Sequence, residues 1–424
     1  MTSKMKHVQV HTHVPGFTRL CTQEESASAL ARYRDGALSL AQLQATGQAL
    51  RERHWARQAQ AGLDWVTVGD CPFGGQVARH VALFGCAPHR FASAAAASRH
   101  DGTALTVALA AGLDGAAPLA SRSWFGTAAD ELVPELGPDT TFALACEQLF
   151  DDVARAQALG HAVKASLIGP LTLLWSSTEA DDGADTPGFS RLDLLERLLP
   201  VYGAVLDRLK AQGVQWVQMA EPILGLDLPY AWRNAFEPAY WQLNQVGIPL
   251  LLATYLSPLE ENVSLACRLP VAGVHVDGVR AVHELTSAAD WLPSHKVLSV
   301  GIVDGSQLWR TDLDLALARL APLLEKRGRQ LWLATSCDVQ VPFGIPVEQM
   351  LDDETRSWLA FAADKLGELA LLKAALGNDG PLRTLLPTAF ATARAACASR
   401  RAHGWQDPAA GPRTRAAARA GVAG

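Results

Sequence analysis

The chain has 424 residues, of which 49% are hydrophobic and 19% are charged, so it is long enough to bury a large core. Its formal net charge of −6 argues against a general binder of nucleic acid or other polyanions. The first residues lack the apolar core of a secretory signal, and no uncharged apolar run reaches the length of a membrane span. The seven cysteines are scattered and form no Cys-x-x-Cys pair, so we expect reduced thiols and a cytoplasmic protein.

Strand-like and helix-like patterns alternate along most of the chain. Short apolar runs predict eight strands, at residues 8–13, 64–70, 163–174, 214–219, 249–256, 272–278, 296–305 and 329–339. Apolar residues at helical spacing predict helices at residues 24–34, 39–60, 75–85, 139–160, 190–209, 230–246, 281–291, 312–326 and 354–376. Between the second and third strands the pattern is irregular and includes an extended piece at 118–125.

The order of these elements predicts the fold class. Near-continuous apolar strands indicate a sheet covered on both faces, and the helices between them indicate parallel connections. We therefore predict an α/β protein with a single (β/α)8 barrel over residues 1–376 and an irregular insertion after the second strand. An open doubly wound sheet is the alternative, but the chain has no Gly-x-Gly-x-x-Gly or P-loop motif.

The last part of the chain has a different composition. Residues 377–424 are rich in Ala and Arg and are interrupted by Pro and Gly. We expect a linker-like, partly disordered tail that contains one short helix near 387–402 and packs against nothing else.

Polar residues stand at several predicted strand ends, where parallel barrels carry their chemistry. Glu221 follows the strand at 214–219 and precedes a proline, so it is either a functional carboxylate or a cap or ion pair. Asp70, Asp277 and Cys337 stand at the ends of other strands. These four residues are weak catalytic candidates that would converge at one mouth of the barrel. The alternative is that they are polar groups satisfied within a packed rim.

Two further patterns resemble parts of metal sites. His11 and His13 lie two apart on the first strand, so both side chains share one face, but the strands at 163–168 and 249–256 end without further ligands. A second group has a spacing that matches no common zinc pattern: Cys71, His80, Cys86 and His89. We predict no metal site from either group.

Several ordered segments together resemble the N-terminal barrel of cobalamin-independent methionine synthase, and the resemblance covers nearly all of residues 7–376. The matching segments are HVPGFTRL (13–20), ALRERHWARQAQAGLDWVTVGD (49–70), SLIGPLTLLW (166–175), RLDLLERLLPVYGAVLDRL (191–209), VQWVQMAEPIL (214–224), LLLATYL (250–256), LSVGIVDG (298–305) and SWLAFAADKLGELALL (357–372). The resemblance implies a barrel from an enzyme that transfers a methyl group from a methyltetrahydropteroyl-polyglutamate to homocysteine.

The family enzyme has two barrels, and zinc and homocysteine are bound in the C-terminal one. That zinc barrel carries a His-x-Cys, an acidic residue and a cysteine at successive strand ends. When the zinc barrel is aligned with the present barrel, its His-x-Cys corresponds to Ala253 and Tyr255. Its acidic residue and its cysteine correspond approximately to Asp277 and Cys337. Two possible ligands do not make a tetrahedral zinc site. We expect no cofactor in this chain, and zinc only where a partner barrel supplies its ligands.

The resemblance also implies where the folate tail would bind, through an Arg-Glu-Leu-Lys run and a lysine further on. The preceding turn survives here and ends in Arg19, but the run reads Glu24-Glu25-Ser26-Ala27 and the lysine position is Ser123. Arg19, Glu24, Glu25 and Ser123 are therefore weak substrate-binding candidates. The missing cations argue against tight binding of a folate polyglutamate.

The family's Tyr-Asp-His and the aspartate of its Asp-Glu-Pro are also absent, since Phe73, Gly74, Gly75 and Ala220 stand in their places. We expect a barrel that does not transfer methyl groups by itself. It would be a subunit or scaffold for a separate zinc-bearing barrel, or the product of a truncated gene. The alternatives are an independent enzyme that uses the barrel mouth and a binding protein for a pterin or amino acid.

Overall fold

The computed structural model describes residues 9–17, 23–69, 72–127, 129–179, 189–342, 351–377 and 381–405. Its centre is one parallel sheet of eight strands, and each of the eight predicted strands is present. The strands are β1 (His11–His13), β2 (Val66–Val68), β6 (Val163–Ile168), β8 (Trp216–Ala220), β9 (Leu250–Ala253), β10 (Gly273–Asp277), β11 (Val297–Val303) and β12 (Leu331–Thr335).

The order of the strands makes the sheet an almost closed ring. They follow one another as β1-β12-β11-β10-β9-β8-β6-β2, without the reversal of order that an open doubly wound sheet requires. At the seam between β1 and β2, the Asp64 N–H donates to the Thr12 carbonyl over 3.0 Å, and the Thr67 hydroxyl donates to the Val14 carbonyl over 2.6 Å. The predicted (β/α)8 barrel is confirmed.

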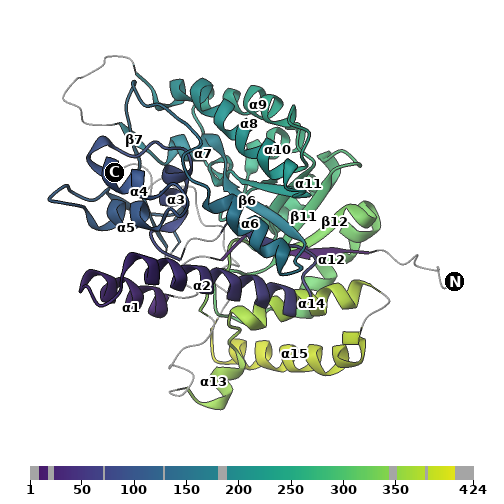
Figure 1. The fold of residues 1–424 in the computed structure, drawn as a ribbon. Coiled ribbons are helices and arrows are strands. Elements are labelled where there is room, and N and C mark those ends of the chain that lie inside the picture. Colours follow the sequence, from purple (N-terminus) through teal and green to yellow (C-terminus); the bar gives the residue numbers. More distant parts are fainter. Residues whose placement is uncertain are drawn as a thin grey trace.

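Helices surround this ring (Figure 1), and in the described residues none combines the length and hydropathy needed to cross a membrane. The helices that precede β9 are α1 (Gln23–Arg34), α2 (Leu40–Gln60), α3 (Gly75–Leu83), α4 (Ala92–Ala97), α5 (Thr103–Ala111), α6 (Gln148–Ala158), α7 (Pro170–Trp175), α8 (Leu195–Ala211) and α9 (Tyr230–Asn244). The later helices are α10 (Val263–Arg268), α11 (Leu285–Trp291), α12 (Leu313–Arg327), α13 (Asp353–Ser357), α14 (Ala362–Leu376) and α15 (Leu386–Ala402).

The irregular insertion lies between β2 and β6, as predicted. Its described residues form helices α3, α4 and α5 ahead of α6, together with an antiparallel hairpin of β3 (Ser121–Ser123) and β4 (Asp130–Leu132), and its β5 (Glu135–Leu136) pairs with β7 (Thr178–Glu179). The helix predicted at 139–160 begins only at Gln148. The reason is that the N–H groups of Ala143 and Ala145 donate to carbonyls at the end of α3, so this segment is held extended.

The C-terminal helices differ from the prediction in two ways. The single helix expected at 354–376 is two helices, α13 and α14, because the Trp358 and Leu359 segment pairs with the loop before α12. The helix expected near 387–402 is α15, but the expectation that the tail packs against nothing was wrong for this helix. It lies beside α14 (Figure 1) and also contacts α12 and α13.

Small residues on one face allow α15 to approach its neighbours. Ala393, Ala396 and Cys397 are buried at helical spacing, and Arg394 pairs with Asp314 of α12 at 2.7 Å. The basic residues that suggested a solvated tail thus include Arg394, which binds an acidic residue of the barrel. Residues 406–424 lie outside the described part of the chain.

Candidate functional site

The interior of the barrel is polar at its middle layer. The Ser299 hydroxyl lies 2.8 Å from His13 Nε2 and 3.0 Å from His275 Nδ1. Nearby, Lys164 Nζ donates to Gln218 Oε1 over 2.5 Å. Burial lowers the pKa of His275 to about 4, and it also lowers the pKa of His13, so both rings are neutral near pH 7. All these side chains are buried, and each is hydrogen-bonded within one of these two groups.

The two histidines of the first strand do not share a ligand set. His13 contacts Ser299, whereas His11 is half-buried with its Nδ1 3.6 Å from an Asp64 oxygen. His80 is buried within α3, Cys86 is buried just after it, His89 is exposed, and Cys71 lies outside the described residues. No group of three or more His, Cys, Asp or Glu side chains in the described part of the chain is arranged to hold a metal ion.

Glu221 lies immediately after β8 and is completely buried. Its carboxylate accepts hydrogen bonds from the Thr172 N–H and hydroxyl at 2.8 and 2.6 Å, from the Leu171 N–H at 3.3 Å, and from the Tyr240 hydroxyl at 3.1 Å. The two N–H groups belong to the first turn of α7, so the capping interpretation of Glu221 is confirmed. Burial raises its pKa to about 7, although all these donors oppose the rise.

Gly169 makes this cap possible. A Cβ atom on Gly169 would overlap the Glu221 carboxylate, so the absence of a side chain lets the carboxylate reach the start of α7. The four hydrogen-bond donors around Glu221 occupy both of its oxygens. In this structure Glu221 is a buried structural group, and its catalytic role stays a prediction.

Asp277 ends β10 and is bound to a cation. Its carboxylate accepts from the N–H groups of Leu256, Val279 and Arg280 at 2.9 to 3.1 Å, and Arg280 Nη1 lies 3.1 Å from Oδ2. Burial raises the pKa of Asp277, while Arg280 opposes the rise. Burial alone would lower the pKa of Arg280, but Asp277 and Asp304 raise it above its usual range. The two charges therefore stabilise one another.

Cys337 lies close to this pair. Arg280 Nη1 is 3.4 Å from the Ser336 hydroxyl, which is 3.8 Å from the Cys337 sulfur. Burial raises the pKa of the Cys337 thiol far above its usual range, so the sulfur stays protonated and is a poor nucleophile or metal ligand. The thiol donates to the Asp338 carbonyl over 3.4 Å.

Of the three mouth candidates among the described residues, the structure brings two together. Arg280 and Ser336 connect Asp277 to Cys337, whereas in the described residues no hydrogen bond or ion pair connects Glu221 to either of them. Asp70 lies outside the described residues. Asp277 and Cys337 have the satisfied, packed arrangement that was the alternative to a catalytic role.

The candidates for binding a folate tail are dispersed. Glu24 and Glu25 lie in the exposed first turn of α1, where Glu25 pairs with Arg53, and Arg19 lies outside the described residues. Ser123 ends β3 and donates its hydroxyl to the Thr127 carbonyl over 2.8 Å. Their role in substrate binding stays a prediction.

The mouth does not fit a zinc ion. Ala253 carries no donor atom, Tyr255 is a buried phenol, Asp277 is bound by Arg280, and Cys337 is a protonated thiol. A zinc site needs several deprotonated ligands facing one point. The Arg280 guanidinium already neutralises Asp277, which is the only carboxylate among these four residues. These residues therefore do not fit a zinc ion.

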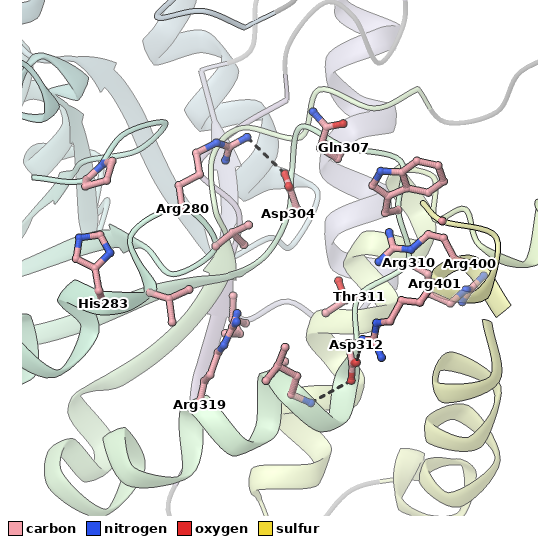
Figure 2. A pocket seen from close by; sticks show the side chains of 18 of the residues that line it. Arg280, His283, Asp304, Gln307, Arg310, Thr311, Asp312, Arg319, Arg400 and Arg401 are labelled. Atoms are coloured by element: carbon pink, nitrogen blue, oxygen red, sulfur yellow. Dashed lines mark hydrogen bonds and ion pairs between the residues drawn. The ribbon is translucent and has the colours of Figure 1, made fainter. Parts of the chain in front are cut away.

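The structure also shows a cleft that the sequence did not predict (Figure 2). It has a volume of about 950 Å³ and lies between the loops after β10 and β11 and the helices α12 and α15. Its described lining includes the side chains of Arg280, Arg310, Arg319, Arg400 and Arg401. The only sequence signal was the Arg400-Arg401 pair, because the other arginines come from separate segments that meet only in the folded chain.

Comparison with known proteins agrees with this architecture. The family model described as "Cobalamin-independent synthase, N-terminal domain" matches residues 11–328. The chain is 47% identical over 397 residues to a 5-methyltetrahydropteroyltriglutamate–homocysteine methyltransferase of Burkholderia thailandensis, covering 92% of this chain and 50% of the relative. A protein of the same name from Burkholderia pseudomallei (strain 1106a) is 48% identical over 372 residues, covering 86% of this chain and 47% of the relative. The chain therefore spans about half the length of these curated relatives.

Solved structures share the fold at low sequence identity. A B12-independent methionine synthase from Shewanella sp. W3-18-1, in complex with selenomethionine, has a TM-score of 0.54 and 14% identity, covering 83% of this chain and 92% of that one. A methyltransferase from Methanosarcina mazei has a TM-score of 0.55 and 12% identity, covering 88% of this chain and 95% of that one. Taken with the family match and the half-length relatives, these findings show that the chain belongs to the cobalamin-independent methionine synthase family, in which it corresponds to the N-terminal domain.

Proposed function

We propose that the chain is the zinc-free half of a divided cobalamin-independent methionine synthase. In this proposal a separate zinc-bearing barrel transfers the methyl group from 5-methyltetrahydropteroyltriglutamate to homocysteine, and the present barrel serves as its scaffold. The relatives from Burkholderia carry the name of this reaction and are about twice as long as the matched region. Their similarity to this chain supports the choice of reaction and of partner.

The observation that carries the proposal is the occupied mouth of the barrel. Asp277 is neutralised by Arg280, and the Cys337 thiol is kept protonated by burial. Neither residue is free to bind a metal or to attack a substrate, while Ala253 and Tyr255 fill the remaining positions with buried side chains. The barrel keeps the framework of the family, but the side chains at its mouth are neutralised or buried. This combination supports a role in assembly and not in the methyl transfer itself.

The first test is a methyl-transfer assay on the purified chain with zinc, homocysteine and 5-methyltetrahydropteroyltriglutamate. We expect no sustained formation of methionine by the chain alone, because the reaction needs a zinc-activated thiolate that its mouth does not provide. Sustained turnover by the chain alone would contradict the proposal.

The second test adds the C-terminal half of the Burkholderia thailandensis relative as a separate, zinc-loaded protein. We expect the two halves to sediment as one complex and to form methionine faster than the C-terminal half by itself. The control is the same C-terminal half stripped of zinc, which should still bind the chain but show no turnover. If the two halves sediment separately and their rates merely add, the scaffold role is wrong.

A further inference from the structure

We propose that the arginine-lined cleft between the strand ends and α15 binds a small molecule that carries at least two anionic groups, carboxylate or phosphate. The cleft adjoins the packed mouth around Cys337 and shares Arg280 with it, and the proposal does not depend on the proposed function. Its volume of about 950 Å³ is that of a typical small-molecule pocket.

The cleft carries an excess of positive charge. Its described lining includes five arginines and three carboxylates, namely Glu260, Asp304 and Asp312, and Asp277 behind the lining pairs with Arg280, so positive charge exceeds negative charge by one. The whole chain has a net charge of −6, so this local excess is opposite in sign to the rest of the molecule. A concave surface of one sign concentrates ligands of the other sign.

Two of the cleft arginines keep their charge available. Asp304 lies 3.8 Å from Arg280, and Asp312 pairs with Arg401. Arg310 donates from Nε and Nη2 to the carbonyls of residues 357 and 359 at 3.0 and 3.1 Å, which leaves its charge without a carboxylate. Across the described part of the chain, no carboxylate pairs with Arg310 or with Arg319, which is half-buried on α12.

The cleft walls hold the arginines on different sides of the cavity. Figure 2 shows Arg310, Arg400 and Arg401 close together on one side and Arg280 with Asp304 on the other, while Arg319 projects from α12. Arg400 lies over the Trp309 ring at 5.0 Å, which holds its guanidinium in a defined place. α12 also begins at this cleft, where its N-cap Asp312 accepts from the Leu315 N–H over 3.1 Å.

The separation of these cations favours a ligand with more than one anionic group over a single small ion. Planar guanidinium groups bind carboxylate and phosphate oxygens with two parallel hydrogen bonds.

The test is isothermal titration calorimetry of the full chain with citrate and, separately, with pyrophosphate, in a buffer without phosphate. Citrate carries three carboxylates and a hydroxyl, and pyrophosphate carries two phosphoryl groups, so the two arms distinguish the anion chemistry. We expect at least one to bind with a Kd between about 10 μM and 1 mM, and to bind more weakly as salt is added.

The variants Arg319→Gln and Arg310→Gln should each weaken this binding about tenfold. Arg329→Gln is the matched control, because Arg329 is exposed beyond the far end of α12 and does not line the cleft. The melting temperature of each variant reports whether it folds. The proposal is overturned if neither ligand binds, or if binding is the same in Arg319→Gln, Arg310→Gln and the control.

Discussion

Two carboxylates at neighbouring parts of the barrel rim are equally buried but are compensated in different ways. Glu221 after β8 is surrounded by neutral donors from Thr172, Leu171 and Tyr240. Asp277 at the end of β10 accepts from three backbone N–H groups and also binds the Arg280 guanidinium. Burial raises the pKa of both, but only Asp277 has a full positive charge to oppose it.

A buried acid at a strand end therefore does not by itself indicate a catalytic role. Without a cation, Glu221 changes its protonation state close to neutral pH, and its site is pH-sensitive. With a cation, Asp277 is part of a fixed ion pair whose removal would leave one charge buried alone. Variants of Arg280 alter the site of Asp277, and variants of Glu221 and Tyr240 alter the site of Glu221.

The largest effect is expected from Arg280→Met, which removes the cation and leaves the Asp277 carboxylate buried. Losing one partner of a buried ion pair typically costs about 3–5 kcal/mol. Urea denaturation near pH 7 measures the change in the free energy of unfolding. The double variant Asp277→Asn with Arg280→Met removes both charges and should be more stable than Arg280→Met alone. If the double variant is the less stable of the two, the ion pair is not the source of the effect.

The second effect is a dependence of stability on pH that comes from Glu221. Its pKa rises from an unperturbed 4.5 to about 7 on folding, so the folded state binds the proton more tightly than the unfolded state. Its contribution is fully present below about pH 4.5 and is lost as the pH rises through about 7, by up to about 3 kcal/mol.

Denaturation series between pH 5 and pH 8 check this, with Glu221→Gln as the variant that cannot ionise. We expect the wild type to lose stability toward pH 8 and the variant to show a flatter profile over the same range. Parallel profiles for the two proteins would mean that Glu221 does not titrate in this window.

The smallest effect is expected from Tyr240→Phe, which removes one donor to Glu221. A hydrogen bond to a charged group contributes more than one to a neutral group, so the loss should be about 1–2 kcal/mol at pH 8 and less at pH 5. Tyr202→Phe is the control, because the Tyr202 hydroxyl donates to the Ile168 carbonyl over 2.6 Å. Its cost should not change with pH. Equal pH profiles for the two variants would argue that Tyr240 does not stabilise the charged form of Glu221.

Sequence patterns predicted the barrel because its strands are buried on both faces. Runs such as those of β8, β9 and β11 contain almost only apolar residues between loops, and their number and order specify a ring. Tertiary contacts caused the differences. The segment before α6 is extended because it pairs with the end of α3, and α15 packs because its buried alanines meet α12 and α14.

The site was predicted less completely, for a physical reason. Asp277 and Cys337 were placed correctly at strand ends, but the sequence did not indicate that Arg280, three residues after Asp277, turns back to bind it. The cleft was missed because Arg310, Arg319 and Arg400 lie on a loop, a helix and a distant C-terminal helix. Only the packing of α15 brings these charges together.

The seam of the ring has a consequence for how the barrel opens. In the described residues no strand ladder joins β1 to β2. Besides the backbone and Thr67 hydroxyl bonds across this seam, one carboxylate contributes: Asp64 accepts from the Thr12 N–H over 2.7 Å and from Lys373 Nζ of α14 over 2.6 Å. Burial alone would raise the pKa of Asp64, but neighbouring His11 and Lys373 hold it well below its usual range. Asp64 thus links the first strand to α14 through one side chain. Amide hydrogen exchange should be fastest in the sheet along this line, and strong acid, by protonating Asp64, should widen it before the remaining strands separate.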